Sequence, residues 1–319
     1  MKKTLRCFFI KSFKRIALFL FKYTIFRCYV AGETEAEALE MARRLHSCGF
    51  GVISDILGEA VTSDESALRY ALRYVSHMNH VSEILRENPD TRFDVSAKLS
   101  SFGIRFNPKL AFLLSGRILN EASRRGIELQ IDMEGPELMS QTIAIVYDLI
   151  RDFRLRNPGK SVPLRLALPA NQLQSHAVFS QIARTGVRIR VVKGAYAGDI
   201  PDKSINDYFL NLLHRAVAHG ADTAMGTHDK ENIIEKAWNN HPELKLQGLF
   251  GVRMFYQEKL ARSGRGNYIY MPWGSVDDAF LYLSRRIKEG IRPKVLALFL
   301  MNVIESIVWR AHASRKINF

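Results

Sequence analysis

The chain has 319 residues, of which 47% are apolar, 10% aromatic and 24% charged. This composition is typical of a globular protein with a large core, and it excludes disordered and fibrous classes. The formal net charge of +14 at pH 7 suggests a polyanionic partner, either nucleic acid or an anionic membrane. Length alone does not decide between one domain and two, because α/β barrels reach about 250 residues as one domain.

The positive charge is concentrated at the N-terminus. Residues 1–30 contain eight Lys and Arg and no acidic residue, which leaves only +6 for the remaining 289 residues. These bases recur every three to four positions among Phe, Leu and Ile, a pattern typical of a helix in a membrane interface. The alternative is a helix that packs its apolar face on the protein and exposes a solvated basic face. Nucleic acid is the weaker candidate, because the rest of the chain has no recognition motif for it.

Three features of the sequence indicate the compartment. The cysteines, Cys7, Cys28 and Cys48, are an odd number and fit a reducing compartment better than a disulfide framework. The longest apolar run near the N-terminus, 16–21, stops at Lys22. We therefore expect neither a signal peptide nor a spanning helix. A cytoplasmic protein is expected, with peripheral contact between residues 1–28 and the inner face of the cell membrane.

The predicted elements begin with an amphipathic helix over 33–46, which has acids first and bases last, as the helix dipole favours. Short β-rich segments follow at 51–59, 94–100, 127–134, 162–169, 187–194, 222–229, 245–251 and 267–274. Helical patterns lie between or after them, including 110–122, 140–155, 208–218 and 275–289. Eight strands alternating with helices over residues 51–290 predict a single (β/α)8 barrel of the TIM type.

Two doubly wound domains are the competing architecture. They would be expected to carry a GxGxxG motif after a strand and a Pro/Gly-rich linker, and the sequence has neither. We therefore predict an α/β fold, a (β/α)8 barrel with N-terminal helices. The chain is expected to divide into a basic amphipathic segment, 1–28, and a single barrel domain, 29–319.

Charged residues interrupt the predicted strands. Four of them lie within or at the ends of β-rich segments: Lys98, Asp132, Arg190 and Lys193. Barrel interiors are usually filled by Val, Ile and Leu, and buried charges are costly unless they are paired. Either these residues pair with one another, or they line a site for a charged ligand at the C-terminal end of the barrel, where barrel active sites form.

The last predicted helix carries a second group of polar residues. Tyr282, Arg285 and Arg286 occupy positions i, i+3 and i+4, so they share one face. Two guanidinium groups beside an aromatic ring suit a small carboxylate, and a solvated salt-bridge face is the alternative. Ser275 and Asp278 resemble a capping pair at the start of this helix, and Glu289 lies close enough to orient an arginine.

Nine short motifs follow one another along the chain. They are VAGET at 30–34, DILGE at 55–59, SAKLS at 96–100, IDME at 131–134, RVVKGAY at 190–196, THD at 227–229, LQGLFG at 246–251, YMPWG at 270–274 and YLSRR at 282–286. In this order, and at these strand ends, they make the sequence resemble the proline dehydrogenase family over roughly residues 29–290. The resemblance implies a (β/α)8 barrel that holds FAD without a Rossmann fold.

The resemblance also implies residues for catalysis and substrate binding. Six would be catalytic: Lys98, Asp132, Tyr270, Tyr282, Arg285 and Arg286. The two arginines would clamp the substrate carboxylate, with Lys98 as a third cation and Glu289 orienting the pair. Ala195 and Leu249 would join the two tyrosines in enclosing the pyrrolidine ring, and Asp132 would complete the pocket floor.

Nine residues would contact the cofactor according to the same resemblance: Arg190, Val192, Lys193, Gly194, Ala195, Thr227, His228, Gln247 and Glu289. Arg190 would lie near the reactive nitrogen of the flavin and stabilise the negative charge that develops there. Lys193 and Gly194 would approach the ribityl and phosphate portion. We expect no metal site, because His228 has no second ligand at a workable spacing.

The implied reaction is the oxidation of L-proline to Δ1-pyrroline-5-carboxylate by hydride transfer to FAD. The electrons would pass to a membrane quinone, and a separate dehydrogenase would oxidise the imine. One alternative is a related cyclic amino acid such as hydroxyproline or an N-alkyl proline, and another is a non-catalytic membrane-associated barrel. The fourth strand departs from the family, which usually carries Gln-Ala-Tyr there, because this chain reads LRLALP at 164–169. The flavin contact of that Gln is therefore lost or replaced.

Overall fold

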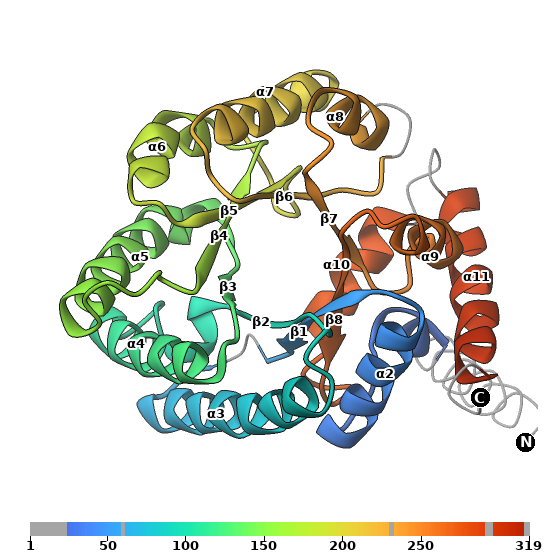
Figure 1. Ribbon diagram of the computed structural model, residues 1–319, viewed down its shortest axis with the longest axis horizontal. Helices are drawn as coiled ribbons and strands as arrows, with labels where there is room; N and C mark the ends of the chain where they lie inside the picture. The colour runs from blue at the N-terminus through green and yellow to red at the C-terminus, as the bar shows by residue number, and fades with distance from the viewer. Residues whose placement is uncertain (1–23, 59–60, 230–232, 291–295, 316–319) are drawn as a thin grey trace, which may run out of the picture.

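The computed structural model describes residues 24–58, 61–229, 233–290 and 296–315. A closed barrel of parallel strands in chain order forms its centre, and helices surround the barrel (Figure 1). The strands are β1 (Gly51–Ile56), β2 (Phe93–Ala97), β3 (Leu129–Ile131), β4 (Leu164–Pro169), β5 (Arg188–Val192), β6 (Thr223–Gly226), β7 (Lys245–Leu249) and β8 (Asn267–Trp273). Each predicted β-rich segment overlaps one of these strands, so the predicted (β/α)8 barrel is confirmed.

The barrel closes where the first strand meets the last. β1 pairs with β8 at six positions, from Gly51 with Tyr268 to Ile56 with Trp273, and all eight strand pairs are parallel. Parallel strands end at the same rim of a barrel. Polar side chains at the C-terminal ends of different strands therefore meet at that rim, although they lie far apart in the sequence.

Helices connect the strands and cover the outside of the barrel (Figure 1). They are α2 (Glu35–Ser47), α3 (Asp64–Glu87), α4 (Pro108–Arg125), α5 (Pro136–Arg156), α6 (Leu173–Arg184), α7 (Ile205–Ala218), α8 (Glu235–Asn240), α9 (Met254–Arg262), α10 (Phe280–Gly290) and α11 (Leu296–Arg315), with 3-10 turns η1 (Leu99–Phe102) and η2 (Asp202–Ser204). The apolar sides of most helices pack with the strands in one large core, and the buried residues of α10 belong to a second cluster with residues 25–30. Burial of this apolar surface is the main force that holds the helices on the barrel.

Local signals set the helix ends. The side chain of Asn107 accepts a hydrogen bond from the backbone N–H of Leu110, and Pro108 occupies the first turn of α4. This combination satisfies one free N–H and fixes the backbone angle where a helix begins. Gly126 then ends α4 with φ +68°, a left-handed conformation that favours glycine.

The predicted start of the last barrel helix was wrong by five residues. α10 begins at Phe280, and residues 276–279 form a turn. The Ser275 and Asp278 pair does form, since Ser275 Oγ accepts from the Asp278 N–H at 3.2 Å. However, Tyr70 of α3 also donates to Asp278 Oδ1 at 3.0 Å. The pair therefore fixes a turn against α3 and does not cap α10.

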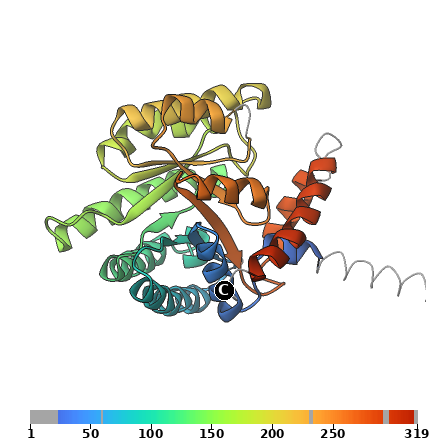
Figure 2. The same ribbon diagram turned by 45° about the vertical axis from the view of Figure 1, so that its right-hand side comes forward.

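The first described residues pack against α11. Residues 24–29 are helical, and Phe26 and Tyr29 lie in a buried cluster with Phe299. The Ser306 hydroxyl donates to the Cys28 carbonyl at 2.9 Å. Figure 2 shows α11 beside the barrel, next to the blue start of the described chain. The predicted boundary between residues 28 and 29 falls within this packed stretch, and residues 1–23 lie outside the described part.

No helix in the described ranges combines the length and the apolar character that crossing a bilayer requires.

Candidate active site

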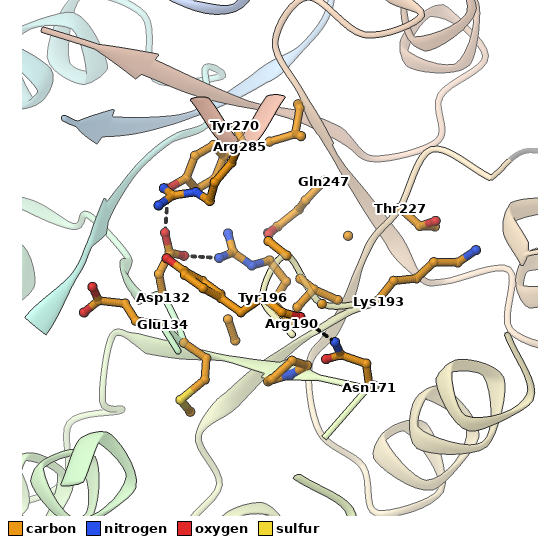
Figure 3. A pocket seen from close by; sticks show the side chains of 18 of the residues that line it. Asp132, Glu134, Asn171, Arg190, Lys193, Tyr196, Thr227, Gln247, Tyr270 and Arg285 are labelled. Carbon is orange, nitrogen blue, oxygen red and sulfur yellow. Dashed lines mark hydrogen bonds and ion pairs between the residues drawn. The ribbon is translucent and has the colours of Figure 1, made fainter. Parts of the chain in front are cut away.

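A cavity of about 360 Å³ lies at the C-terminal end of the barrel (Figure 3). Its lining comes from six of the strands, from residues that follow strands, including Lys98 after β2 and Asp132 after β3, and from α10. Cavities of about 300–1,000 Å³ with a few polar groups are typical of small-molecule sites. The predicted site residues that line it are Lys98, Asp132, Arg190, Val192, Lys193, Gly194, Ala195, Thr227, His228, Gln247, Leu249, Tyr270, Tyr282, Arg285 and Arg286. The remaining one, Glu289, has a side chain outside the described part, so its contacts stay predictions.

Two cations and two carboxylates form a cluster at the base of this cavity. Lys98 Nζ lies 2.6 and 2.8 Å from the two carboxylate oxygens of Asp55, which is fully buried. Arg190 pairs with Asp132, as the dashed line in Figure 3 marks. Tyr270 connects the two pairs, since its hydroxyl donates to Asp132 at 2.5 Å and accepts from Lys98 at 3.3 Å. Pairing offsets the cost of burying these charges.

The surroundings set the protonation of this cluster. Burial alone would raise the pKa of Asp132, but the positive charges of Arg190 and Lys98 lower it below the ordinary value. Burial raises the pKa of Tyr270 well above its ordinary value, and the carboxylates of Asp132 and Asp55 add to this shift. At neutral pH, Asp132 is therefore ionised and Tyr270 keeps its proton.

The contact between Lys98 and Asp55 changes the interpretation of Lys98. The sequence predicts that Lys98 is a cation for a ligand carboxylate and assigns no role to Asp55. In the structure, Asp55 balances the charge of Lys98 at 2.6 Å. Lys98 therefore lines the cavity as predicted, but it adds less net positive charge than the sequence suggested.

The polar face of α10 closes one side of the cavity. Tyr282, Arg285 and Arg286 all line it, which confirms that they share one face and point toward the barrel. The Arg286 guanidinium carbon lies 5.7 Å from the centre of the Tyr282 ring. The Arg285 guanidinium carbon lies 5.3 Å from the centre of the Tyr196 ring. At these distances the aromatic rings stabilise the guanidinium groups by cation–π attraction.

Tyr196 lies on the segment after β5, and Asn171 holds that segment in place. The Asn171 side-chain amide donates to the Tyr196 carbonyl at 2.8 Å. The backbone carbonyl of Asn171 accepts hydrogen bonds from the backbone N–H groups of Asp199 and Ile200, at 3.1 and 3.2 Å. Gly194 has φ +115°, and a Cβ there would lie 2.0 Å from Asn171 Oδ1. Only glycine allows this close approach.

His228 is neutral in the cavity wall. Its Nε2 accepts a hydrogen bond from the Leu249 backbone N–H at 2.9 Å, so the ring proton is on Nδ1. Burial lowers the pKa of His228 to about 3, and the positive charges of Arg286 and Arg253 contribute to this shift. His228 can therefore act as a hydrogen-bonding group at neutral pH but carries no positive charge.

Three buried polar atoms in the lining have no hydrogen-bond partner among the described residues. They are Asn171 Oδ1, Gln247 Oε1 and Arg190 Nε, and all three residues are at least 94% buried. A buried polar atom without a partner typically costs about 1–3 kcal/mol. A ligand with a donor for Gln247 and an acceptor for Arg190 would remove this cost.

β4 reaches the cavity only through apolar residues. Ala167 and Pro169 are the β4 residues that line the cavity, so this strand supplies no polar side chain to the described lining. Arg165 lies two positions earlier, nearer the N-terminal end of the barrel, and its Nε contacts Glu128 at 2.6 Å. Arg165 also bonds to the Asp222 carbonyl at 3.0 Å. The unusual fourth strand therefore places its arginine in an ion cluster outside the cavity.

Sequence reasoning missed several lining residues. Asp55 begins the DILGE motif inside the predicted β-rich segment 51–59, and an acid within a predicted strand is the signal that marks it. Tyr196 ends the RVVKGAY motif but was assigned no role. Asn171 gave no signal, because its function depends on how one loop packs against another.

A family model described as proline dehydrogenase matches residues 38–199, about half of the chain. The chain belongs to the proline dehydrogenase family. It is therefore an oxidoreductase, and the family resemblance found in the motifs is confirmed. The match spans β1 to β5 and includes Asp55, Lys98, Asp132 and Arg190.

Individual proteins agree with the proline dehydrogenase assignment. The chain is 27% identical over 290 residues to proline dehydrogenase 1 of Bacillus subtilis strain 168, covering 88% of this chain and 90% of that protein. It is 27% identical over 286 residues to the proline dehydrogenase of Deinococcus radiodurans, covering 83% and 86%. The crystal structure of proline utilization A from Bdellovibrio bacteriovorus has a TM-score of 0.75 at 16% identity, covering 85% of this chain and 33% of that chain. This chain thus spans about a third of that structure, and the likeness supports the fold.

Proposed function

We propose that the protein is an FAD-dependent proline dehydrogenase that oxidises L-proline to Δ1-pyrroline-5-carboxylate. The observation that carries this proposal is the position of Arg285 and Arg286, which line the same cavity as the ionised Asp132. An amino acid has a carboxylate for the arginines and an amine for an acidic or polar environment. A separate oxidising enzyme would consume the imine product.

The residues present fit a flavin. Its ring edge has an N–H donor as well as nitrogen and oxygen acceptors, and the cavity offers the unmet Gln247 Oε1 and Arg190 Nε. Lys193, on the rim and 2.9 Å from Asp229 Oδ2, has an ammonium group that would suit the phosphates of FAD. The chain would hold FAD with the cofactor residues expected from the sequence: Arg190, Val192, Lys193, Gly194, Ala195, Thr227, His228, Gln247 and Glu289.

When bound, FAD would supply the acceptor for the hydride that leaves the ring carbon next to the proline nitrogen. The side chains of this chain would bind and orient the substrate. Arg285 and Arg286 would fix its carboxylate, and Tyr270 and Tyr282 would enclose its ring together with Leu249 and Ala195. The Arg190 guanidinium would provide a fixed positive charge, which stabilises negative charge that develops nearby.

The electrons would pass from the flavin to a membrane quinone. The protein would be cytoplasmic, and residues 1–28 would contact the inner face of the cell membrane peripherally. The bases in residues 1–30, without any acid, support this proposal. The exposed side of α11 supports it too, because five of its apolar residues are at least half exposed: Leu300, Met301, Ile304, Ile307 and Val308. An exposed apolar surface together with a basic segment in the same chain suits an anionic bilayer. The basic segment would precede a single catalytic domain, 29–319.

An absorbance experiment tests the reaction. Protein loaded with FAD should lose its flavin absorbance when L-proline is added without oxygen, and hydroxyproline and N-methylproline test the alternative substrates. Arg285→Met and Arg286→Met should each abolish the bleaching by proline and leave thermal unfolding nearly unchanged. Arg117→Met, on the exposed side of α4, is the matched control. Protein that cannot be loaded with FAD, or unaffected bleaching in both cavity variants, would contradict the proposal.

Vesicle flotation tests the membrane contact. The intact chain should float with vesicles that contain phosphatidylglycerol, and a chain lacking residues 1–22 should float much less. The deletion stops at residue 22 so that Ile25 to Tyr29 keep their packing against α11. Equal flotation of both chains would assign the basic residues to a solvated surface.

A further inference from the structure

Gln130 connects the cavity to a second group of charges deeper in the barrel. It lies on β3, and only 1% of its surface is exposed. Its amide oxygen accepts from Arg190 Nη1 at 3.1 Å, and its amide nitrogen donates to Asp94 Oδ2 at 3.1 Å. The amide therefore bridges a guanidinium in the cavity lining and a carboxylate near the N-terminal end of the barrel.

The two partners fix which way the amide points. A guanidinium can only donate hydrogen bonds, and an ionised carboxylate can only accept them. The Gln130 oxygen must therefore face Arg190, and the nitrogen must face Asp94. The reversed amide would place two donors against each other at Arg190 and two acceptors against each other at Asp94.

Gln130 and Asp132 together determine the orientation of Arg190. Gln130 binds Nη1, Asp132 binds Nη2, and the guanidinium carbon lies 5.3 Å from the centre of the Tyr270 ring. The third nitrogen, Nε, is the one without a hydrogen-bond partner among the described residues. Without Gln130, Asp132 alone would anchor the guanidinium, which could then rotate about that single contact.

We propose that Gln130 is a positioning residue for Arg190: it fixes the guanidinium so that Nε and the positive charge face the cofactor. This inference rests on the proposed function, because it takes FAD as the group that Arg190 meets. A charge held in one orientation stabilises the negative charge gained on reduction without having to reorganise. Gln130 therefore raises the reduction potential of the flavin and strengthens its binding.

The ion cluster below keeps Gln130 in place from the other side. Charged or titratable groups surround Asp94 there: Glu128, Arg165, Arg188, Arg92 and Tyr268. Asp222 pairs with Arg165 and Arg188, and Lys245 pairs with Asp222. Burial raises the pKa of Asp94 to about 7, and the negative charge of Glu128 adds to the shift. An ionised Asp94 carboxylate can only accept a hydrogen bond from the Gln130 amide, whereas a protonated Asp94 can also donate one. The fixed orientation of the amide therefore weakens as the pH falls below about 7.

Three variants test the proposal. Gln130→Leu removes all three hydrogen bonds of the amide, to Arg190, Asp94 and Glu128, while Gln130→Glu keeps an acceptor for Arg190 but adds a negative charge. Gln174→Leu is the matched control on α6, where the amide bonds to Ser140 outside the cavity. The measurements are the FAD dissociation constant, the midpoint potential of the bound flavin at pH 6 and pH 8, and a crystal structure of each variant without FAD.

We expect Gln130→Leu to bind FAD about tenfold more weakly, because loss of a hydrogen bond to a charged group has this order of effect. Its midpoint potential should fall, and Arg190 should occupy a different rotamer. Gln130→Glu should keep Arg190 in place and bind FAD with little loss, yet its midpoint potential should also fall. The difference in potential between wild type and Gln130→Leu should be larger at pH 8 than at pH 6.

The proposal is overturned if Gln130→Leu binds FAD with the wild-type dissociation constant and the bound flavin keeps its midpoint potential. This holds whether or not the variant loses thermal stability. If the wild type does not bind FAD, the proposed function fails, and the FAD-free structures still decide the role of Gln130. An Arg190 side chain in the same place in Gln130→Leu and wild type would then refute it.

Discussion

Replacement of Asp55 by Asn should destabilise the protein, because it breaks a buried ion pair. The substitution leaves Lys98 Nζ 3.8 Å from the carboxylate oxygen Oδ2 of Asp132. Removing one partner of a buried pair typically costs about 3–5 kcal/mol. We expect about 3 kcal/mol, because asparagine keeps one oxygen that can accept from Lys98 and Tyr270 also contacts Nζ.

Lys98→Met should cost a similar amount, because it leaves the Asp55 carboxylate buried without its cation. The double variant Asp55→Asn/Lys98→Met removes both charges together, so its cost should be well below the sum of the single costs. We expect a coupling energy of about 2–3 kcal/mol between the two positions.

Urea unfolding of the wild type and the three variants measures these free energies, provided that the slope with urea stays the same. A second cycle on Glu65 and Arg69, an ion pair whose side chains are 82% and 61% exposed, is the control. Its coupling should stay below about 0.5 kcal/mol. Additive costs at Asp55 and Lys98, within about 0.5 kcal/mol, would refute the idea that the two charges are balanced as a pair.

Two further predictions concern other parts of the cavity wall. Asn171→Ala should raise the KM for proline several-fold with a smaller change in kcat, because it releases the segment that places Tyr196 beside Arg285; a steady-state result with altered kcat alone would speak against this role. The pKa of His228, about 3, lies below that of an unfolded histidine, about 6.5, so the folded state binds fewer protons between these values. Stability should therefore fall as pH falls below 6.5, by up to about 2 kcal/mol at pH 5 from this residue. Urea unfolding at pH 7 and pH 5 should show a smaller loss in His228→Gln than in wild type, and an equal loss would contradict the assignment.

Most of the barrel could be predicted because its strands recur at regular intervals and end in recognisable residues. Helix α11 could not be predicted in the same way. Its sequence is apolar on nearly all sides, so no helical period separates the side that packs from the exposed one. The start of α10 was misplaced because the local sequence signal at Ser275 is real but serves a contact with α3.

The predicted cavity residues came largely from the motifs, and the residues that support them could not be found in that way. β1 is buried along its whole length, so no alternation of polar and apolar residues marks Asp55 as facing inward. Gln130 is likewise one polar residue in a buried strand. Arg165 and Ala167 share a side of β4, but the sequence does not tell which of them reaches the cavity.

The pairing of β1 with β8 has a consequence for synthesis of the chain. Gly51 and its partner Tyr268 are 217 positions apart, so one edge of β1 stays unpaired until nearly the whole barrel has been translated. Unpaired strand edges invite association with other chains. Closure is completed at the end of β8, where the Trp273 indole N–H donates to Ser54 Oγ of β1 at 2.8 Å. We therefore expect nascent chains that stop before Trp273 to depend most on chaperones.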